Sequence, residues 1–138
     1  MELLGKVNKI IIHHSQRQND FPEFIRQRHI QRGFEDIGYH WLVDAEGNLY
    51  KGRDEKFIGA HVFGHNKDSF GVCLIGDLDK AHPTKKQIST LIEFLRDKAI
   101  QNKISTENIL GHREFPNVTK TCPGKFVDME EIRRLVEN

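Results

Sequence analysis

The sequence predicts an α/β fold: a single domain with a central mixed β-sheet flanked by helices. Three observations lead to this prediction. A β-branched run near the start is typical of a buried strand, further short β-prone runs recur along the chain, and helical apolar periodicity stands between two of them. With 138 residues the chain is long enough to bury one core, and it shows no repeat or linker, so we expect residues 1–138 to form one domain.

The first elements are a strand and a helix. Residues 7–13 are predicted to form a strand, because Ile10–Ile12 is β-branched on successive positions and suits a strand buried on both faces. Asp20 with Glu23 then predicts the N-terminal cap of a helix. Gly33 is expected to end that helix, since glycine readily takes the left-handed turn.

A hairpin and another strand follow. Residues 39–43 and 48–51 are β-prone, and residues 44–47 supply turn chemistry between them, which predicts a hairpin. Residues 70–75 show the pattern of a buried strand, in which Cys73 is expected to be a small core residue.

The second half begins with the clearest helix of the chain. Thr84 and Gln87 form a capping box after Pro83. The apolar stripe that follows comprises Ile88, Leu91, Ile92, Leu95 and Ala99. This spacing predicts one buried helix face. Residues 108–110 are expected to form a short strand, and residues 128–136 a last helix capped by its first residue.

Composition excludes several classes of function. The formal charge is +1, from 21 basic and 20 acidic residues, which argues against a nucleic-acid partner, since such proteins concentrate positive charge. Residues 1–8 lack the apolar core of a signal peptide, and no stretch approaches the ~20 apolar residues of a membrane span. We therefore expect a cytoplasmic protein as synthesised. Two cysteines allow at most one disulfide, and we expect none.

Three residues have the chemistry of a metal site. Cys122 lies ten residues after His112, and His13 closes the isoleucine run. Two imidazoles and a thiolate are good ligands for Zn²⁺, and three protein ligands with an open fourth position are typical of a catalytic, hydrolytic zinc. The gap of about a hundred residues between the two histidines matches no short zinc motif. The spacing alone is therefore weak evidence.

Five segments together are more specific. They are Ile10–Ser15, Ile37–Trp41, Gly52–Asp54 with Gly59–His61, Ser69–Gly76, and Gly111–Glu114 leading to Lys120–Gly124. In order and spacing, over about residues 7–127, the chain resembles the zinc amidase family that includes T7-type phage lysozymes and the peptidoglycan recognition proteins. The resemblance implies a mixed sheet flanked by helices and hydrolysis of the amide between N-acetylmuramic acid and L-alanine.

The resemblance also implies the roles of particular residues. Zn²⁺ would be held by His13, His112 and Cys122. Tyr39 matches the family's catalytic tyrosine and Lys120 its catalytic lysine, which would stabilise an oxyanion. His61 matches a position near the cleft floor, and we expect it to bind substrate, with a structural hydrogen bond as an equal alternative.

His14 competes with His13 as a ligand, but adjacent strand residues point to opposite faces, and the family match places the ligand first. We expect His14 to pack against the sheet or to support a ligand. The expected partner is peptidoglycan or its muropeptides, and the expected state is a monomer. The protein would act on the cell wall after release or on internalised muropeptides.

Two other functions remain open on the sequence. Family members that only bind peptidoglycan commonly lack the ligand cysteine, so Cys122 favours the enzyme over a recognition module. T7-type members also bind and inhibit a phage RNA polymerase, through a surface that no motif here identifies.

Overall fold

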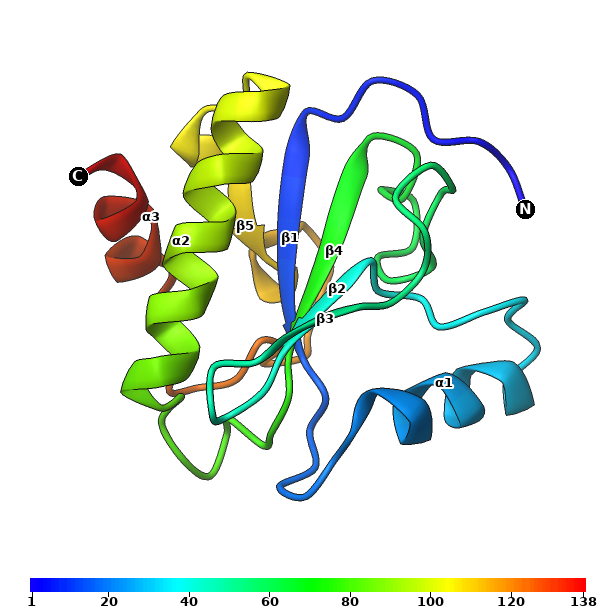
Figure 1. The fold of residues 1–138 in the computed structure, drawn as a ribbon, viewed down its shortest axis with the longest axis horizontal. Helices are drawn as coiled ribbons and strands as arrows, with labels where there is room; N and C mark the ends of the chain where they lie inside the picture. The colour runs from blue at the N-terminus through cyan, green and yellow to red at the C-terminus, as the bar shows by residue number, and fades with distance from the viewer.

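The computed structural model describes residues 1–138, and its centre is a five-stranded β-sheet with helices on both faces (Figure 1). The strands are β1 (Lys9–His14), β2 (Trp41–Val43), β3 (Leu49–Lys51), β4 (Ser69–Leu74) and β5 (Ile109–Gly111). In space they follow the order β3-β2-β4-β1-β5. Neighbouring strands pair in parallel except β2 and β3, which form an antiparallel hairpin. The predicted mixed sheet flanked by helices in a single domain is confirmed.

The predicted strands all occur, displaced by one or two residues at their ends. β1 begins at Lys9 rather than Val7 and includes His14. It lies inside the sheet, hydrogen-bonded to β4 on one side and β5 on the other. Ile10, Ile11 and Ile12 are fully buried, because both faces of this strand are covered. The isoleucine run thus has the environment that its β-branching predicts.

The helices are α1 (Pro22–Gln31), α2 (Lys85–Asn102) and α3 (Met129–Glu137), with two 3₁₀ turns, η1 (Thr106–Asn108) and η2 (His112–Glu114). The predicted capping box of α2 is confirmed: the Thr84 hydroxyl accepts from the Gln87 backbone N–H at 3.1 Å, and the Gln87 side chain accepts from the Thr84 N–H at 3.4 Å. Asp128 caps α3, as expected, by accepting from the Glu131 N–H at 3.1 Å.

The predicted cap of α1 is wrong. Its N-cap residue is Phe21, without a side-chain cap, and Pro22 occupies the first turn, where a missing N–H costs nothing. The Asp20 carboxylate instead accepts from the Phe21 N–H at 3.0 Å and from the Arg28 guanidinium at 3.1 Å. The ion pair between Asp20 and Arg28 therefore connects the residue before α1 to the last turn of that helix. Gly33 follows the helix with a φ of +98°, as predicted.

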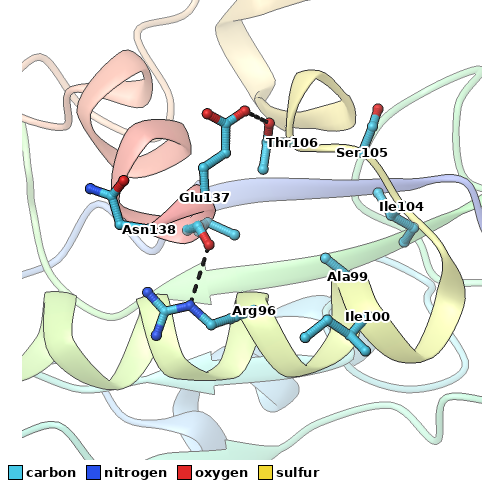
Figure 2. Close-up of a pocket in the computed structure, with 9 residues that line it drawn as sticks. Arg96, Ala99, Ile100, Ile104, Ser105, Thr106, Glu137 and Asn138 are labelled. Carbon is cyan, nitrogen blue, oxygen red and sulfur yellow. Dashed lines mark hydrogen bonds between the residues drawn. The ribbon is translucent and has the colours of Figure 1, made fainter.

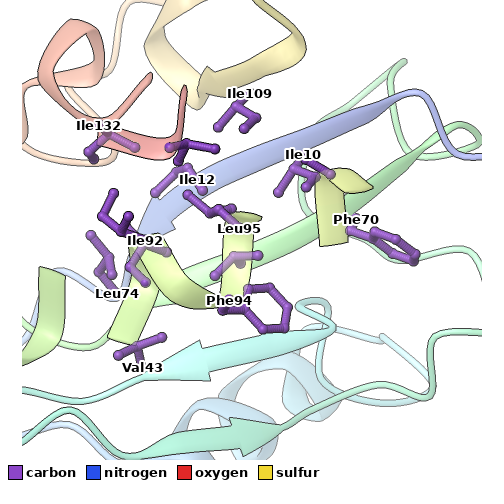
Figure 3. Packing of buried hydrophobic residues seen from close by; sticks show 14 of the residues in the cluster. Ile10, Ile12, Val43, Phe70, Leu74, Ile92, Phe94, Leu95, Ile109 and Ile132 are labelled. Atoms are coloured by element: carbon purple, nitrogen blue, oxygen red, sulfur yellow. The ribbon is translucent and has the colours of Figure 1, made fainter. Parts of the chain in front are cut away.

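The main hydrophobic core lies between the sheet and the pair α2 and α3 (Figure 3). It consists of 19 buried residues, whereas the clusters elsewhere contain five and three. Ile10 and Ile12 enter it from β1, and Leu95 from α2. The predicted stripe of α2 is therefore core, since all its members are buried or packed against this cluster.

The opposite face of the sheet, next to α1, carries two smaller apolar clusters. Ile25 of α1 packs with Leu42 and Cys73, and Ile11 packs with Phe115 in a separate group. Both cysteines are free thiols, with Cys73 fully buried. No helix combines the length and apolar character needed to cross a membrane.

Candidate metal centre

The site forms where two parallel strands end at the same edge of the sheet. β1 and β5 pair in parallel, with Ile12 opposite Gly111. His13 lies next to the end of β1, and His112 follows β5 immediately. Because the carboxyl ends of parallel neighbours meet at one edge, the two imidazoles come together although they lie 99 positions apart in the sequence. Their ring centroids are 4.9 Å apart.

Cys122 is brought to this edge by the residue after His112. The Arg113 backbone N–H donates to the Cys122 carbonyl at 2.8 Å, and its guanidinium donates to the carbonyls of Thr121 at 3.2 Å and Gly124 at 2.7 Å. One arginine therefore holds the loop that carries the thiol against the turn that carries the imidazole. The sequence does not reveal this role, because every residue has a backbone carbonyl and the residue types do not show which carbonyls the arginine binds.

His13, His112 and Cys122 form one compact group. Their potential ligand atoms all lie within 4.8 Å of one another, and His13 Nδ1 is 3.7 Å from Cys122 Sγ. Ligands bound to one tetrahedral zinc at its usual bond lengths are about 3.3–3.8 Å apart. The separation of His13 Nδ1 and Cys122 Sγ lies in this range and the others are at most 4.8 Å, so the group could bind a metal ion after side-chain adjustments.

Burial sets the charge of the site. It lowers the pKa of His13 well below 6.5, and the neighbouring His61 and His112 lower it further. Burial likewise lowers the pKa of His112, with a contribution from the Lys120 ammonium. Both imidazoles are therefore neutral at pH 7, which is the form that binds metals. Burial raises the pKa of the Cys122 thiol to about 11, so metal binding at neutral pH must displace its proton.

Tyr39 lies beside the group, with its ring centroid 5.1 Å from that of His13. It precedes β2 by two residues, and the Arg53 N–H holds its carbonyl at 2.8 Å. Burial raises the pKa of the Tyr39 phenol well above 10. The phenol is therefore protonated at neutral pH and can donate a hydrogen bond, but it is not a base.

Lys120 and His61 are the two remaining candidate site residues. Lys120 is exposed in the loop two residues before Cys122. Its charge adds to the burial that lowers the pKa of His112, and it offsets part of the burial that raises the pKa of Cys122. His61 is partly buried, and its Nδ1 lies 2.9 Å from Nε2 of His13. Its contact with the candidate ligand is thus a direct side-chain hydrogen bond.

His14 faces the other side of the sheet, as the alternation of β1 predicts. It is buried, and its Nδ1 accepts from the Leu78 backbone N–H at 3.0 Å. His29 and His40 are also buried and hydrogen-bonded, with ring nitrogens that accept from Gly38 at 2.8 Å and Gly71 at 3.0 Å. These histidines have packing roles.

A separate hollow of ≈ 500 Å³ lies between the C-terminal ends of α2 and α3 (Figure 2). None of the metal-site residues lines it. The Arg96 guanidinium on its wall donates to the last carbonyls of α3, to Leu135 at 2.7 Å and to Val136 at 3.3 Å. Arg96 thus caps the C-terminus of α3, and its positive charge interacts with the last carbonyls of that helix.

The fold and the site together define an α/β protein with a His–His–Cys group, able to hold a metal ion, at the carboxyl edge of its sheet. Residues 4–125 match the family described as N-acetylmuramoyl-L-alanine amidase. The chain belongs to this family.

Individual relatives agree with this assignment. The endolysin of Escherichia phage T7 is 46% identical over 111 residues, which cover 77% of this chain and 71% of that endolysin. The endolysin N-acetylmuramoyl-L-alanine amidase LysCS from Clostridium intestinale superposes with a TM-score of 0.91 at 29% identity, covering 99% of this chain and 89% of that one. Peptidoglycan recognition protein-LE in complex with tracheal cytotoxin superposes with a TM-score of 0.83 at 28% identity, covering 97% and 83%.

The relatives are longer than the matched region. The chain spans 66–71% of the phage endolysins of KP32, K11 and T7, and 16% of a human N-acetylmuramoyl-L-alanine amidase.

Proposed function

We propose that this protein hydrolyses the amide bond between N-acetylmuramic acid and L-alanine in peptidoglycan, with a zinc ion held by His13, His112 and Cys122. The observation that carries the proposal is the convergence of these three side chains, within 4.8 Å of one another, in a chain that belongs to the amidase family. Three ligands from the protein leave a fourth position free, which is the arrangement of a catalytic zinc.

The donor set suits zinc rather than a hard cation. Mg²⁺ and Ca²⁺ prefer oxygen ligands, whereas imidazole and thiolate suit Zn²⁺. When bound, zinc would polarise the scissile carbonyl and lower the pKa of a water molecule from ~15.7 to about 7, which supplies a nucleophile at neutral pH. The buried, neutral state of His13 and His112 keeps their lone pairs free for this role.

Lys120 is the proposed oxyanion partner. Attack on the amide places negative charge on the carbonyl oxygen, and a positive group nearby stabilises that charge. The charge of the Lys120 ammonium favours the deprotonated forms of both His112 and Cys122, so it acts on the site. Its exposed position leaves it free to contact a substrate.

Tyr39 is the proposed orienting group. Its protonated phenol lies next to His13 and can donate a hydrogen bond to the attacking water or to the substrate oxygen. Because its pKa is raised rather than lowered, we assign it orientation and proton relay, not general-base catalysis.

The names of the relatives support the proposed substrate class. LysCS and the T7 protein are named as endolysins, and the recognition protein-LE structure contains a monomeric peptidoglycan fragment. We infer that residues 1–138 include an amidase catalytic domain that takes peptidoglycan or muropeptides, and that it acts on the cell wall after release. A peptidoglycan-binding module without turnover is the second candidate, supported by the same recognition-protein structure. The presence of Cys122 favours the enzyme.

Product analysis tests the proposal. The zinc-loaded protein is incubated with purified muropeptides, and the products are identified by mass. Amide hydrolysis should release intact stem peptides with a new L-alanine amine and leave the glycan strands uncut. Binding without any product would favour the recognition module. New reducing sugars without free alanine amines would indicate a glycosidase, which uses paired carboxylates instead.

A further inference from the structure

A chain of three hydrogen bonds leads from the candidate ligand His13 into the protein. Nε2 of His13 lies 2.9 Å from Nδ1 of His61, and Nε2 of His61 lies 3.4 Å from the Ser69 hydroxyl. That hydroxyl donates to the carbonyl of His65 at 2.7 Å. The chain therefore ends at a group that can only accept.

This end point determines the direction of every bond in the chain. A carbonyl has no proton, so the Ser69 hydroxyl uses its single proton on His65 and offers only lone pairs to His61. Nε2 of His61 must then be the donor. A neutral imidazole has one N–H, so Nδ1 of His61 is an acceptor, and Nε2 of His13 must donate to it.

The consequence for His13 is a defined tautomer. With its proton on Nε2, the lone pair of the ring lies on Nδ1, which is the atom 3.7 Å from Cys122 Sγ. We propose that Ser69 and His61 are positioning residues that hold His13 as its Nε2–H tautomer and thereby aim its Nδ1 lone pair at the metal site. The inference rests on the proposed zinc function for its purpose, but the tautomer is a property of the metal-free protein.

The surroundings of His61 support a fixed position for its ring. It packs on Gly71 of β4, where an added Cβ would lie 2.6 Å from His61 Cγ, so only glycine leaves room for it. The backbone N–H of His61 and that of Val62 both donate to the Asn66 side chain, at 3.0 and 2.9 Å. β4 pairs with β1, so Gly71, on which His61 packs, and His13 belong to adjacent strands.

Of the two roles that the sequence left open for His61, substrate contact and a structural hydrogen bond, this arrangement favours the second. Metal-bound histidines commonly donate their second ring N–H to an acceptor, which fixes ring orientation and raises ligand basicity. Here the acceptor is the imidazole of His61, and the Ser69 hydroxyl determines which of its two ring nitrogens donates and which accepts.

The first test measures the tautomer without metal. Protein labelled with ¹⁵N-histidine is studied at about pH 8, where unperturbed imidazoles are neutral, by two-bond ¹H–¹⁵N correlation. His13 should be the Nε2–H form in the wild type and a mixture in His61→Leu, which has no acceptor. His61→Asn should restore the wild-type form, because an amide oxygen can occupy the position of Nδ1. A uniform Nε2–H tautomer in His61→Leu would overturn the inference.

The second test uses zinc alone, in competition with a chelator. His61→Leu should bind zinc about 10–100-fold more weakly than the wild type, the usual loss for an outer hydrogen-bond partner, and His61→Asn should recover most of that affinity. His40→Asn is the matched control: it changes a buried histidine whose ring lies 6.0 Å from that of His61, and it should leave the His13 tautomer and the zinc affinity unchanged.

The two proposals fail separately. A wild-type protein that binds no zinc would refute the metal function, whereas equal zinc affinity in the wild type and His61→Leu would refute the positioning role. If His61→Leu does not fold, Ser69→Ala replaces it: the smaller change frees Nε2 of His61, and His13 should then lose its single tautomer. A His13 ring that stays entirely Nε2–H in Ser69→Ala would contradict the proposed relay.

Discussion

The two faces of the sheet differ in composition although the same strands supply both. β1 directs Ile10 and Ile12 toward α2 and α3, into a cluster of 19 buried residues, and directs Ile11 and His13 toward the α1 side. On that side the apolar clusters contain five and three residues, and the candidate metal site lies on the same face as both. Successive residues of β1 therefore point alternately to the main core and to the face with the candidate metal site. Substitutions on the core face should mainly change the free energy of unfolding, and substitutions at the site should mainly change activity.

The largest functional effect is expected from Cys122→Ser. The wild type should contain about one equivalent of zinc, removal of zinc by a chelator should abolish hydrolysis, and added Zn²⁺ should restore it. Cys122→Ser removes a direct ligand, so it should lose zinc and activity while the metal-free protein keeps nearly its wild-type free energy of unfolding. Elemental analysis, activity and urea denaturation in chelator measure the three quantities.

Cys73→Ser is the matched control for the thiol. Cys73 is fully buried beside Leu42, and its thiol donates to the carbonyl of Leu74 at 3.7 Å and not to a candidate ligand. It should lose stability because a hydroxyl is buried, and it should keep its zinc. Full hydrolytic activity in a metal-free protein would contradict the metal site altogether.

Leu95→Ala should give the opposite pattern. Leu95 is fully buried in the main core between α2 and the sheet. Truncation of such a leucine costs about 2–5 kcal/mol of the free energy of unfolding, because apolar contacts are lost and a cavity remains. Zinc content and kcat per folded molecule should stay near the wild-type values. A large drop in kcat without a change in stability would mean that the two faces are not independent.

Lys120→Ala should affect the rate alone. If its ammonium stabilises the oxyanion, removal should lower kcat by roughly 10²–10³, with zinc content unchanged. Single-turnover kinetics on a purified muropeptide measure the change. Tyr39→Phe, which removes only a hydroxyl, should reduce kcat less.

Loss of zinc or of folding in Lys120→Ala would make the residue structural. Wild-type kcat with intact zinc would assign the oxyanion to another donor.

The sequence predicts the core face better than the site face. The stripe of α2, the cap at Thr84 and the burial of Ile10–Ile12 follow from periodicity and local chemistry, and each is confirmed. Local rules failed at the start of α1, where Phe21 is the N-cap residue, no side chain caps the helix, and Pro22 lies in the first turn. There Asp20 had a more distant partner in Arg28, which no local pattern reveals.

The site depends on contacts between distant segments. The isoleucine run places His13 at the end of a strand. Cys122 lies in a loop, where no hydrophobic periodicity predicts its position, and only the family resemblance linked the two residues. The bond from His13 to His61 spans 48 residues and depends on a loop that folds back over β4. Its one local signal is Gly71, a glycine inside a buried strand, which indicates the close approach of another group.

The smallest effect should come from a histidine that belongs to the site face but not to the metal site. His29 of α1 is buried, and its Nδ1 accepts from the Gly38 N–H at 2.8 Å, a bond that only the unprotonated nitrogen can make. Burial, with the nearby Arg32 and Arg28, lowers the pKa of His29 to about 4. An unfolded histidine has a pKa of about 6.5.

The sign of the pH dependence follows from these two values. Well above pH 6.5 His29 is neutral in both states, so its contribution to stability is complete. As the pH falls toward 4 the unfolded chain takes up the proton first, and stability is lost. His29→Asn keeps an acceptor near the Nδ1 position and cannot titrate. Between about pH 7.5 and pH 5, measured by urea denaturation in chelator, the wild type should lose about 1–2 kcal/mol more than His29→Asn. Equal losses in the two proteins would show that His29 is protonated as readily in the folded state as in the unfolded chain.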